Sequence, residues 1–484
     1  MKIYKNVLLL VSVFFFSVYL SCDNSGWISL FDGKSLNGWK AVEHPDTWKV
    51  EDGALVCNGE RSHLFYVGDV NGGTFKNFEL TADVKTKPGS NSGIYVHTEV
   101  QETGWPNKGY ECQVINSYPD VEPGAYVERK MTGSIYGIRN VWKASVPDEE
   151  WFHYHIKVMG RTIQTFINDE LMAEYTESDD PVLIELLRGR RIGSGTFALQ
   201  GHDPGSTVYY KNIKVKPLPD DVETPGKPLE DAEYDAKLIR LAQRNFPLMD
   251  LHVHLKGGLT AEQALANART YGFTYGLAVN CGLKMRYETN DALEEFLANY
   301  EKPTNTYLAM QAEGREWLDL FSKETVAKFD YVFTDAMTWT NNSGKRMRLW
   351  IKEETEVGDP QDFMSQLVAA IEKILTEPID IYVNPTYLPD EIAHMYDELW
   401  TPERMDRVIT ALLENGVALE INNRRKIPSQ AFIQRAKDAG VKFTFGTNNG
   451  GIDDLGNLDY CIAMVEACGL QPADMWHPED RIKN

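Results

Sequence analysis

Short runs of alternating apolar and polar residues recur along roughly the first 200 residues of the chain, and they leave little choice of fold there. Three of them are T-W-K-V-E-D-G-A-L-V-C-N-G, F-E-L-T-A-D-V-K-T and H-Y-H-I-K-V-M-G, with glycine, asparagine or aspartate at the turns. Successive side chains of a strand point to opposite faces, so each run can bury one face and leave the other polar. The spacing of the runs predicts an all-β sandwich over residues 25–218.

A different pattern follows a proline-rich connector. Prolines and acidic residues between positions 217 and 228, followed by a short helical run near 229–244, make residues 219–245 a linker. In residues 246–484, helical runs such as 261–271 and 405–415 alternate with strand-like ones. The strand-like runs are 248–253, 275–279, 306–312, 331–334, 379–383, 418–421 and 442–445. This alternation predicts a parallel barrel of the (β/α) type.

The overall charge narrows the range of partners. A chain of 484 residues with a formal net charge of -22 carries no basic patch of the kind that nucleic acids or anionic membrane surfaces require. Neutral sugars would not be repelled. Apart from Cys22, the cysteines are odd in number and scattered, which indicates neither a disulfide framework nor a C-x-x-C zinc site.

The N-terminus has the features of an export signal over residues 1–22. Lys2 and Lys5 precede an apolar run from Val7 to Leu20, which is short for a membrane anchor. The ending Leu20-Ser21-Cys22 resembles a bacterial lipoprotein signal, which implies lipidation of Cys22. Ordinary secretory cleavage is the alternative. Either interpretation predicts export to the periplasm or outer membrane, with membrane contact only through a lipid anchor at Cys22.

Two neighbouring runs predict one polar sheet face. In N-S-G-I-Y-V-H-T-E, the alternation places Tyr95, His97 and Glu99 on one side of a strand. In G-Y-E-C-Q-V-I-N, Glu111 and Gln113 share a face. Together the two strands would present carboxylates, an imidazole, an amide and a phenol to a polar ligand. An ordinary solvated antiparallel face is the alternative.

Six motifs carry a resemblance to a known family. They occur in the order L-F-D-G-K-S-L-N-G-W, N-S-G-I-Y-V-H, G-Y-E-C-Q-V-I-N, T-G-S-I-Y-G, W-F-H-Y-H-I-K-V and A-L-Q-G-H. Together they resemble the 3-keto-disaccharide hydrolase family, which implies a concanavalin-like sandwich and a glycosidase of the hydrolase or lyase type. His97 and Lys211 stand where this family is expected to have arginine.

The implied chemistry differs from ordinary glycoside hydrolysis with its paired carboxylates. A ketone at C3 acidifies the hydrogen on C2, because the carbanion left behind is delocalised into an enolate. The enolate expels the C1 oxygen, and water adds afterwards. Such a site needs one general base, a donor or cation at the enolate oxygen, and an acid for the leaving group.

The resemblance and the strand alternation together give a set of candidate residues. We expect Glu111 to be the base, and His97 or His202 to be the acid or the oxyanion donor. His202 has the same strand parity as Gln200. The expected contacts to a carbohydrate substrate are Gln113, Gln200, Tyr136, Tyr95 and Asn91. A carbohydrate-binding module without chemistry is an alternative of a different class.

The predicted barrel opens with D-L-H-V-H, in which His252 and His254 face the same way and could bind one metal ion. With E-I-N at 420–422 and G-T-N-N-G near the C-terminus, this motif resembles the PHP (polymerase and histidinol phosphatase) family of metal-dependent phosphoesterases. The resemblance implies a PHP-like (β/α)7 barrel with three metal ions. The expected ligand positions near Asn280, Asn384 and Asn448 have lost their histidines and aspartate.

The remaining PHP-type ligands suffice for one divalent metal ion, zinc or manganese. They are His252, His254 and Glu313, with Asp335 as a further candidate. A site emptied of metal and lined by amides is the alternative. The sequence thus predicts an exported two-domain glycosidase with its chemistry in the sandwich. The competing interpretation is a single-metal barrel hydrolase or phosphoesterase with a carbohydrate-binding sandwich.

Overall fold

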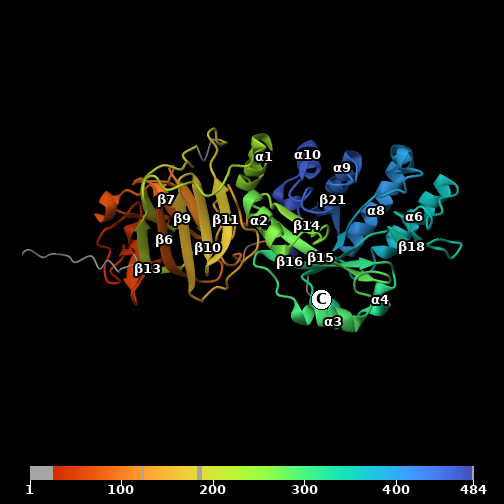
Figure 1. Ribbon diagram of the computed structural model, residues 1–484, viewed down its shortest axis with the longest axis horizontal. Helices are drawn as coiled ribbons and strands as arrows, with labels where there is room; N and C mark the ends of the chain where they lie inside the picture. The colour runs from red at the N-terminus through yellow and green to blue at the C-terminus, as the bar shows by residue number, and fades with distance from the viewer. Residues whose placement is uncertain (1–25, 121, 123–124, 183–187, 482–484) are drawn as a thin grey trace, which may run out of the picture.

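A computed structural model describes residues 26–120, 122, 125–182 and 188–481 of the chain. It consists of a β-sandwich and a barrel that lie next to each other along the long axis (Figure 1). The expected export signal and Cys22 lie outside the described residues. Within the described ranges, no helix has the length and apolar character needed to span a membrane.

The N-terminal part is a sandwich of two antiparallel sheets. The larger sheet has the order β11-β10-β9-β6-β13-β4-β3 with β1 beside β13, and the smaller has the order β2-β5-β12-β7-β8. The strands are β1 Ile28–Ser29, β2 Trp39–Ala41, β3 Trp48–Glu51, β4 Ala54–Cys57, β5 Ser62–Tyr66, β6 Phe78–Thr86, β7 Ser92–Thr98, β8 Tyr110–Val114, β9 Phe152–Met159, β10 Thr162–Ile167, β11 Glu170–Thr176, β12 Thr196–Gly201 and β13 Val208–Pro217. The predicted all-β sandwich is confirmed.

The two sheets differ in how they are covered. In β9 of the larger sheet, every second residue is buried in the core between the sheets, as the alternation predicts. In the smaller sheet, every residue of β5, β7, β8 and β12 is buried. Its outer face is therefore shielded as well, and the polar side chains on that face need partners inside the protein.

The C-terminal part is a closed barrel of seven parallel strands, in the order β14-β15-β16-β17-β20-β21-β22. The barrel strands are β14 Met249–Val253, β15 Thr274–Gly282, β16 Thr306–Glu313, β17 Tyr331–Thr334, β20 Ile381–Tyr382, β21 Ala418–Asn422 and β22 Phe443–Gly446, and a hairpin consists of β18 Thr338–Thr340 and β19 Arg346–Arg348. The helices are α1 Ala232–Gln243, α2 Ala261–Tyr271, α3 Asn290–Asn299, α4 Trp317–Leu320, α5 Lys323–Val326, α6 Pro360–Ile374, α7 Tyr396–Leu399, α8 Pro402–Asn415, α9 Gln430–Ala439 and α10 Asp459–Cys468. The predicted parallel barrel is confirmed.

Helix boundaries show where the apolar pattern is an incomplete guide. Helix α2 spans the predicted residues 261–271. Helix α8 begins at Pro402, before the predicted start at Met405, because the Thr401 side chain accepts a hydrogen bond from the Arg404 N–H and caps the first turn. A capped first turn with proline at its start needs no apolar residue.

The connection between β8 and β9, residues 115–151, joins the two domains. Trp142 is fully buried in the hydrophobic core of the barrel, and its Nε1 donates to the Gly272 carbonyl at 3.0 Å. Lys143 Nζ donates to the Thr306 carbonyl at 2.5 Å. These partners lie at the beginning of β15 and β16, so the sandwich covers the amino ends of barrel strands and leaves their carboxyl ends uncovered.

Candidate functional site

Glu111 is the centre of a polar cluster on the outer face of the smaller sheet. The residues before and after it in β8 belong to the core between the sheets, so its own side chain points outward. Arg190 Nη2 donates to Glu111 Oε2 at 3.0 Å, and Gln200 Nε2 donates to Glu111 Oε1 at 2.9 Å. The same Gln200 amide also donates to the Tyr95 hydroxyl at 3.1 Å. The cluster thus combines residues from β7, β8, β12 and the loop before β12.

Gly93 provides the space for this carboxylate. It lies on β7 opposite Gln113, and a Cβ atom added to it would lie 2.9 Å from Glu111 Oε1. A side chain at this position would therefore displace the Glu111 carboxylate. The glycine of the N-S-G motif is required by the site rather than by a turn.

The charges in the cluster compensate one another. The side chains of Arg190 and Glu111 are 5% and 7% exposed, so each needs the other as a partner. Burial alone lowers the pKa of Arg190, but its interactions with Glu111 and Tyr95 outweigh burial and raise the pKa. Burial, and then the charge of Glu111, hold the pKa of Tyr95 well above its usual range. Tyr95 therefore stays a neutral phenol beside a guanidinium–carboxylate pair.

Several polar atoms of this face have no hydrogen-bond partner among the described residues. They are buried, and they comprise Oε1 of Gln113, Oε1 of Gln200, Nε of Arg190 and both ring nitrogens of His63. Buried polar atoms in native proteins are almost always hydrogen-bonded. Their concentration on one sheet face therefore indicates a place where a polar ligand completes the hydrogen bonds.

A second group of polar residues adjoins Glu111 from the connection between β8 and β9. The Tyr136 N–H donates to the Glu111 carbonyl at 2.9 Å, and the Tyr136 hydroxyl donates to Glu128 Oε2 at 2.9 Å. Lys130 Nζ lies 2.8 Å from Glu128 and 4.4 Å from the centre of the Tyr136 ring. Burial lowers the pKa of Lys130 and raises that of Tyr136. Tyr136 thus lies next to Glu111, with its hydroxyl held by Glu128.

The other end of the face is aromatic. His63 pairs across the strands with Gln200, and burial lowers its pKa to about 4, so the ring is neutral. The Trp105 ring lies 5.5 Å from His63 and 5.1 Å from His202 and is 42% exposed. His202 Nδ1 lies 2.6 Å from Asp203 Oδ2. His202 is therefore on the same face as Gln200, at its partly exposed edge.

His97 does not belong to this cluster, and the prediction that it lies beside Glu111 is wrong. Its φ is +57°, and the pairing of β7 with β12 shifts at this point. Its ring packs 5.5 Å from Phe78 of the larger sheet, and its Nε2 lies 2.8 Å from the Lys76 carbonyl oxygen. A left-handed residue breaks the two-residue alternation, so His97 points away from the face that carries Tyr95.

The other predicted substrate contacts lie at or near the cluster. Gln113 Nε2 donates to Asn91 Oδ1 at 3.1 Å, which places Asn91 at the start of β7 beside the polar face. Glu99, by contrast, follows the end of β7 and pairs with Lys108 at the surface.

Arg190 and His63 were not among the predicted residues. Arg190 comes from a loop segment, R-G-R-R, and no strand period could bring it to Glu111. His63 lies on β5 in S-H-L-F-Y, and its strand parity could have identified it.

The predicted metal ligands lie at the carboxyl end of the barrel, but they form hydrogen bonds with amides and with a carboxylate. His252 Nδ1 lies 2.5 Å from Glu420 Oε1. Glu313 Oε1 accepts from Asn280 at 3.2 Å and from Gln311 at 2.7 Å. Burial, followed by the charge of Asp335, raises the pKa of Glu313 to about 8.

The residues at this end do not fit the predicted metal ion. Among residues 26–481, as far as the structure describes them, no three histidine, cysteine, aspartate or glutamate side chains are placed to hold one. Asp335, the further candidate, accepts from Asn384 Nδ2 at 2.9 Å, and burial raises its pKa. His252, His254 and Glu313 thus share one end of the barrel without forming the expected site.

Comparisons with known proteins concern the sandwich. Residues 26–216 match a family described as the 3-keto-alpha-glucoside-1,2-lyase-like domain. A 3-keto-disaccharide hydrolase of Bacteroides thetaiotaomicron is 30% identical over 239 residues, which cover 42% of this chain and 82% of that protein.

Solved structures give weaker similarities. A protein of Parabacteroides distasonis, provisionally assigned as a glycosyl hydrolase, is 27% identical, with coverage of 40% of this chain and 95% of that one and a TM-score of 0.35. The carbohydrate-binding module CBM66 of Bacillus subtilis is 15% identical, with coverage of 37% of this chain and 95% of that one and a TM-score of 0.25. On the strength of the sequence matches over its sandwich, the chain belongs to the 3-keto-disaccharide hydrolase family, whose members are glycoside-cleaving enzymes.

Proposed function

We propose that the sandwich cleaves 3-keto glycosides by removing the C2 proton, eliminating the C1 substituent and hydrating the product. The observation that carries this proposal is the Glu111 carboxylate, held between Arg190 and Gln200 on a sheet face with unpartnered polar atoms around it. The curated relative at 30% identity supports the substrate class, because it is a 3-keto-disaccharide hydrolase.

Glu111 is the proposed base, and Arg190 the proposed partner of the enolate. Glu111 takes the C2 proton, and the electron pair of the C–H bond moves to form the C2–C3 double bond and a negative O3. Arg190 has an unpartnered Nε beside the carboxylate, so its N–H can donate to O3 and its charge can stabilise the enolate. Arg190 thus takes the role of oxyanion donor, for which His97 and His202 were the expected candidates.

The leaving group and the water complete the reaction. The enolate electrons return to form the C1–C2 double bond, and the C1–O bond breaks with its electron pair on the departing oxygen. Because His97 points away from the site, His202 is the acid in this proposal. Its Nδ1 is hydrogen-bonded to Asp203, and its Nε2 would protonate the departing oxygen. Water then adds across the double bond, so the sum is hydrolysis. Gln113, Tyr95 and Asn91 would hold sugar hydroxyls.

Replacing the base tests this proposal. Glu111→Gln keeps the shape of the side chain but cannot accept the proton, so we expect kcat on a 3-keto disaccharide to fall about 1,000-fold. Glu99→Gln, a surface carboxylate just beyond β7, is the matched control and should retain activity. Full activity of Glu111→Gln would overturn the assignment. Binding of intact glycosides with no turnover of 3-keto substrates would favour a carbohydrate-binding module instead.

For the barrel, we infer a PHP-like origin in which most metal ligands have been replaced by asparagine, in line with Asn280, Asn384 and Asn448. The second candidate function is a single-metal hydrolase in this barrel. Two buried atoms without partners among the described residues, His252 Nε2 and Glu313 Oε2, favour it, whereas the lack of a preformed group of three ligands among those residues speaks against it. One equivalent of zinc or manganese per chain, lost together with activity in His252→Ala/His254→Ala, would support it.

The location of the enzyme is part of the same proposal. The export signal over residues 1–22 supports action outside the cytoplasm, in the periplasm or at the outer membrane, with a lipid on Cys22. Mass spectrometry of the mature N-terminus would test it. An unmodified N-terminus after residue 22 would contradict the lipid anchor.

A further inference from the structure

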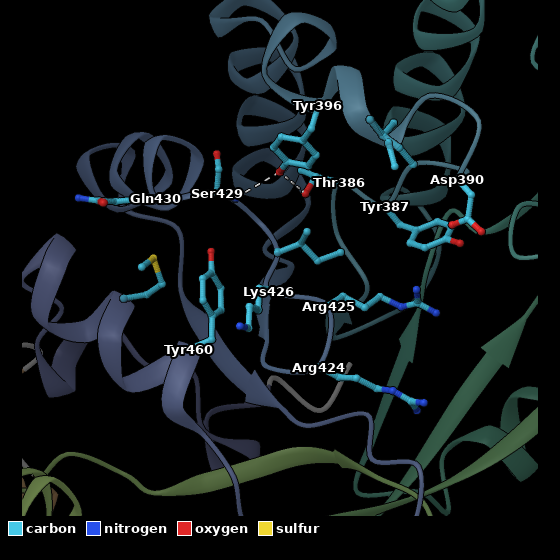
Figure 2. A pocket seen from close by; sticks show the side chains of 14 residues that line it. Thr386, Tyr387, Asp390, Tyr396, Arg424, Arg425, Lys426, Ser429, Gln430 and Tyr460 are labelled. Atoms are coloured by element: carbon cyan, nitrogen blue, oxygen red, sulfur yellow. Dashed lines mark hydrogen bonds between the residues drawn. The ribbon is translucent and has the colours of Figure 1, made fainter. Parts of the chain in front are cut away.

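A cavity of about 830 Å³, drawn in Figure 2, opens at the carboxyl end of barrel strands. It is formed by the segments that follow β20 and β21 and by residues of α10. Ligand pockets in proteins have volumes of roughly 300–1,000 Å³, and parallel barrels carry their sites at this end. The position and size are therefore those of a binding site rather than a packing defect.

The lining of this cavity is rich in positive charge. Three consecutive cations, Arg424, Arg425 and Lys426, line it, and in Figure 2 the two arginines extend toward the side of Tyr387 while Lys426 lies nearer Tyr460. Among the described residues, none of the three forms an ion pair with a carboxylate. Lys256 lies near this cluster, since burial and then the charge of Arg424 lower its pKa, while the charge of Asp454 raises it. In a chain with a formal charge of -22, such a cluster of unpaired cations is a specific feature.

Two contacts hold the arginines in place. The Arg425 guanidinium lies 4.4 Å from the centre of the Tyr387 ring, and Arg424 Nη1 donates to the Asn448 carbonyl at 3.2 Å. A guanidinium stacked on a ring is oriented before a ligand arrives, which reduces the entropy lost on binding. Most of the N–H donors on these two side chains stay available to an anion.

Two tyrosine rings form further walls of the cavity. Tyr396 and Tyr460 line the cavity, and their hydroxyls are already bonded, to Thr386 Oγ1 and to the Pro428 carbonyl, both at 2.6 Å. Their ring faces are thus fixed walls against which a flat or ring-shaped ligand can pack. Asp390 also lines the cavity and is its acidic member.

We propose that this cavity binds a sugar acid, a monosaccharide ring that carries a carboxylate. The carboxylate would accept paired hydrogen bonds from Arg424 and Arg425, and the ring would lie against the tyrosines. Asp390 would accept a sugar hydroxyl, and its charge disfavours a dianionic phosphate more than a monoanionic carboxylate. The sugar part of this inference rests on the function proposed for the sandwich, whereas the anion part rests on the charges alone.

Isothermal titration of the full chain with glucuronate, glucose and glucose 6-phosphate tests the proposal. We expect saturable binding of glucuronate that weakens with salt, and no binding of glucose. Arg424→Gln and Arg425→Gln should each raise the Kd at least about ten-fold. The control Arg435→Gln removes an exposed arginine of α9 that pairs with Asp406, and it should leave the Kd unchanged.

Several results would contradict the proposed sugar-acid site. Failure of glucuronate to bind, or binding that both arginine variants retain, would overturn the proposal. Tighter binding of glucose 6-phosphate would overturn the choice of a carboxylate. Glu111→Gln separates the two sites, because it should abolish turnover of a neutral 3-keto disaccharide and still bind glucuronate. Loss of the sandwich reaction alone would therefore leave the barrel site standing.

Discussion

The sandwich face and the barrel mouth each bury a glutamate next to an amide, but only the glutamate of the sandwich face has a guanidinium beside it. Glu111 lies 3.0 Å from a guanidinium, whereas Glu313 is held by the amides of Asn280 and Gln311. Burial raises the pKa of Glu313 to about 8. A buried carboxylate needs an adjacent cation to stay ionised, because amides compensate its desolvation only in part. The comparison teaches that Glu111 has a guanidinium as its direct partner, whereas amides hydrogen-bond to Glu313.

The two sites are also placed differently in the molecule. The polar face of the sandwich is bordered by the same connection, residues 115–151, that inserts Trp142 into the barrel. The barrel mouth is at the far ends of its strands. The sandwich site therefore adjoins the segment that makes the domain interface.

Removing Trp142 should have the largest effect on this arrangement. We expect Trp142→Ala to lower the free energy of unfolding by about 4 kcal/mol, because a fully buried indole leaves a cavity in the barrel core. Chemical denaturation and the rate of proteolysis within the linker would measure the loss. The control Trp151→Ala removes a 39% exposed indole of the same connection and should cost about 1 kcal/mol or less. Equal losses would contradict the account of the interface.

Lowering the pH should destabilise the protein through the buried His63 imidazole of the sandwich face. Burial lowers the pKa of His63 to about 4, so the folded state resists protonation while the unfolded state accepts it below pH 6.5. Stability should then fall as the pH drops from 6.5 to 4, by about 3 kcal/mol in total.

Replacing His63 by phenylalanine should remove that part of the acid sensitivity. Hydrogen exchange of the β5 amides, compared at pH 4 and pH 6.5, would measure it. His44→Gln changes an exposed histidine and serves as the control, which should keep the full dependence. An unchanged slope in His63→Phe would show that its imidazole is not protected.

Arg190 tests the charge compensation directly. Without its guanidinium the enolate loses its proposed partner, so Arg190→Gln should lower kcat about 100-fold. Arg190→Lys should recover part of the rate, because it restores the charge but not the paired geometry. Steady-state kinetics that separate kcat from KM would show this. A change in KM alone would assign Arg190 to substrate binding and leave the enolate without a cation.

The smallest effect is expected at the barrel mouth. His252→Ala breaks the contact with Glu420 and should destabilise the barrel, but turnover of a 3-keto disaccharide should change less than about three-fold, because distant sites act independently. Thermal unfolding and the sandwich reaction would be measured on the same preparation. A large loss of turnover would instead favour chemistry in the barrel.

Local burial explains which parts of the fold could be predicted. The seven predicted barrel strands overlap the observed ones, and β17 has the predicted bounds of residues 331–334. The face shared by Tyr95 and Glu111 also followed from strand parity. Both succeed because side-chain alternation is a property of each extended segment by itself.

His97, Arg190 and Glu420 mark the limit of that reasoning. A single left-handed residue turned His97 toward the core, and Arg190 and Glu420 reach their partners from segments distant in the sequence. The sequence by itself determined where the strands lie and which faces they bury, since these depend on neighbours along the chain. Only the tertiary structure decided which charges meet, because a buried ion pair forms between segments that the fold brings together.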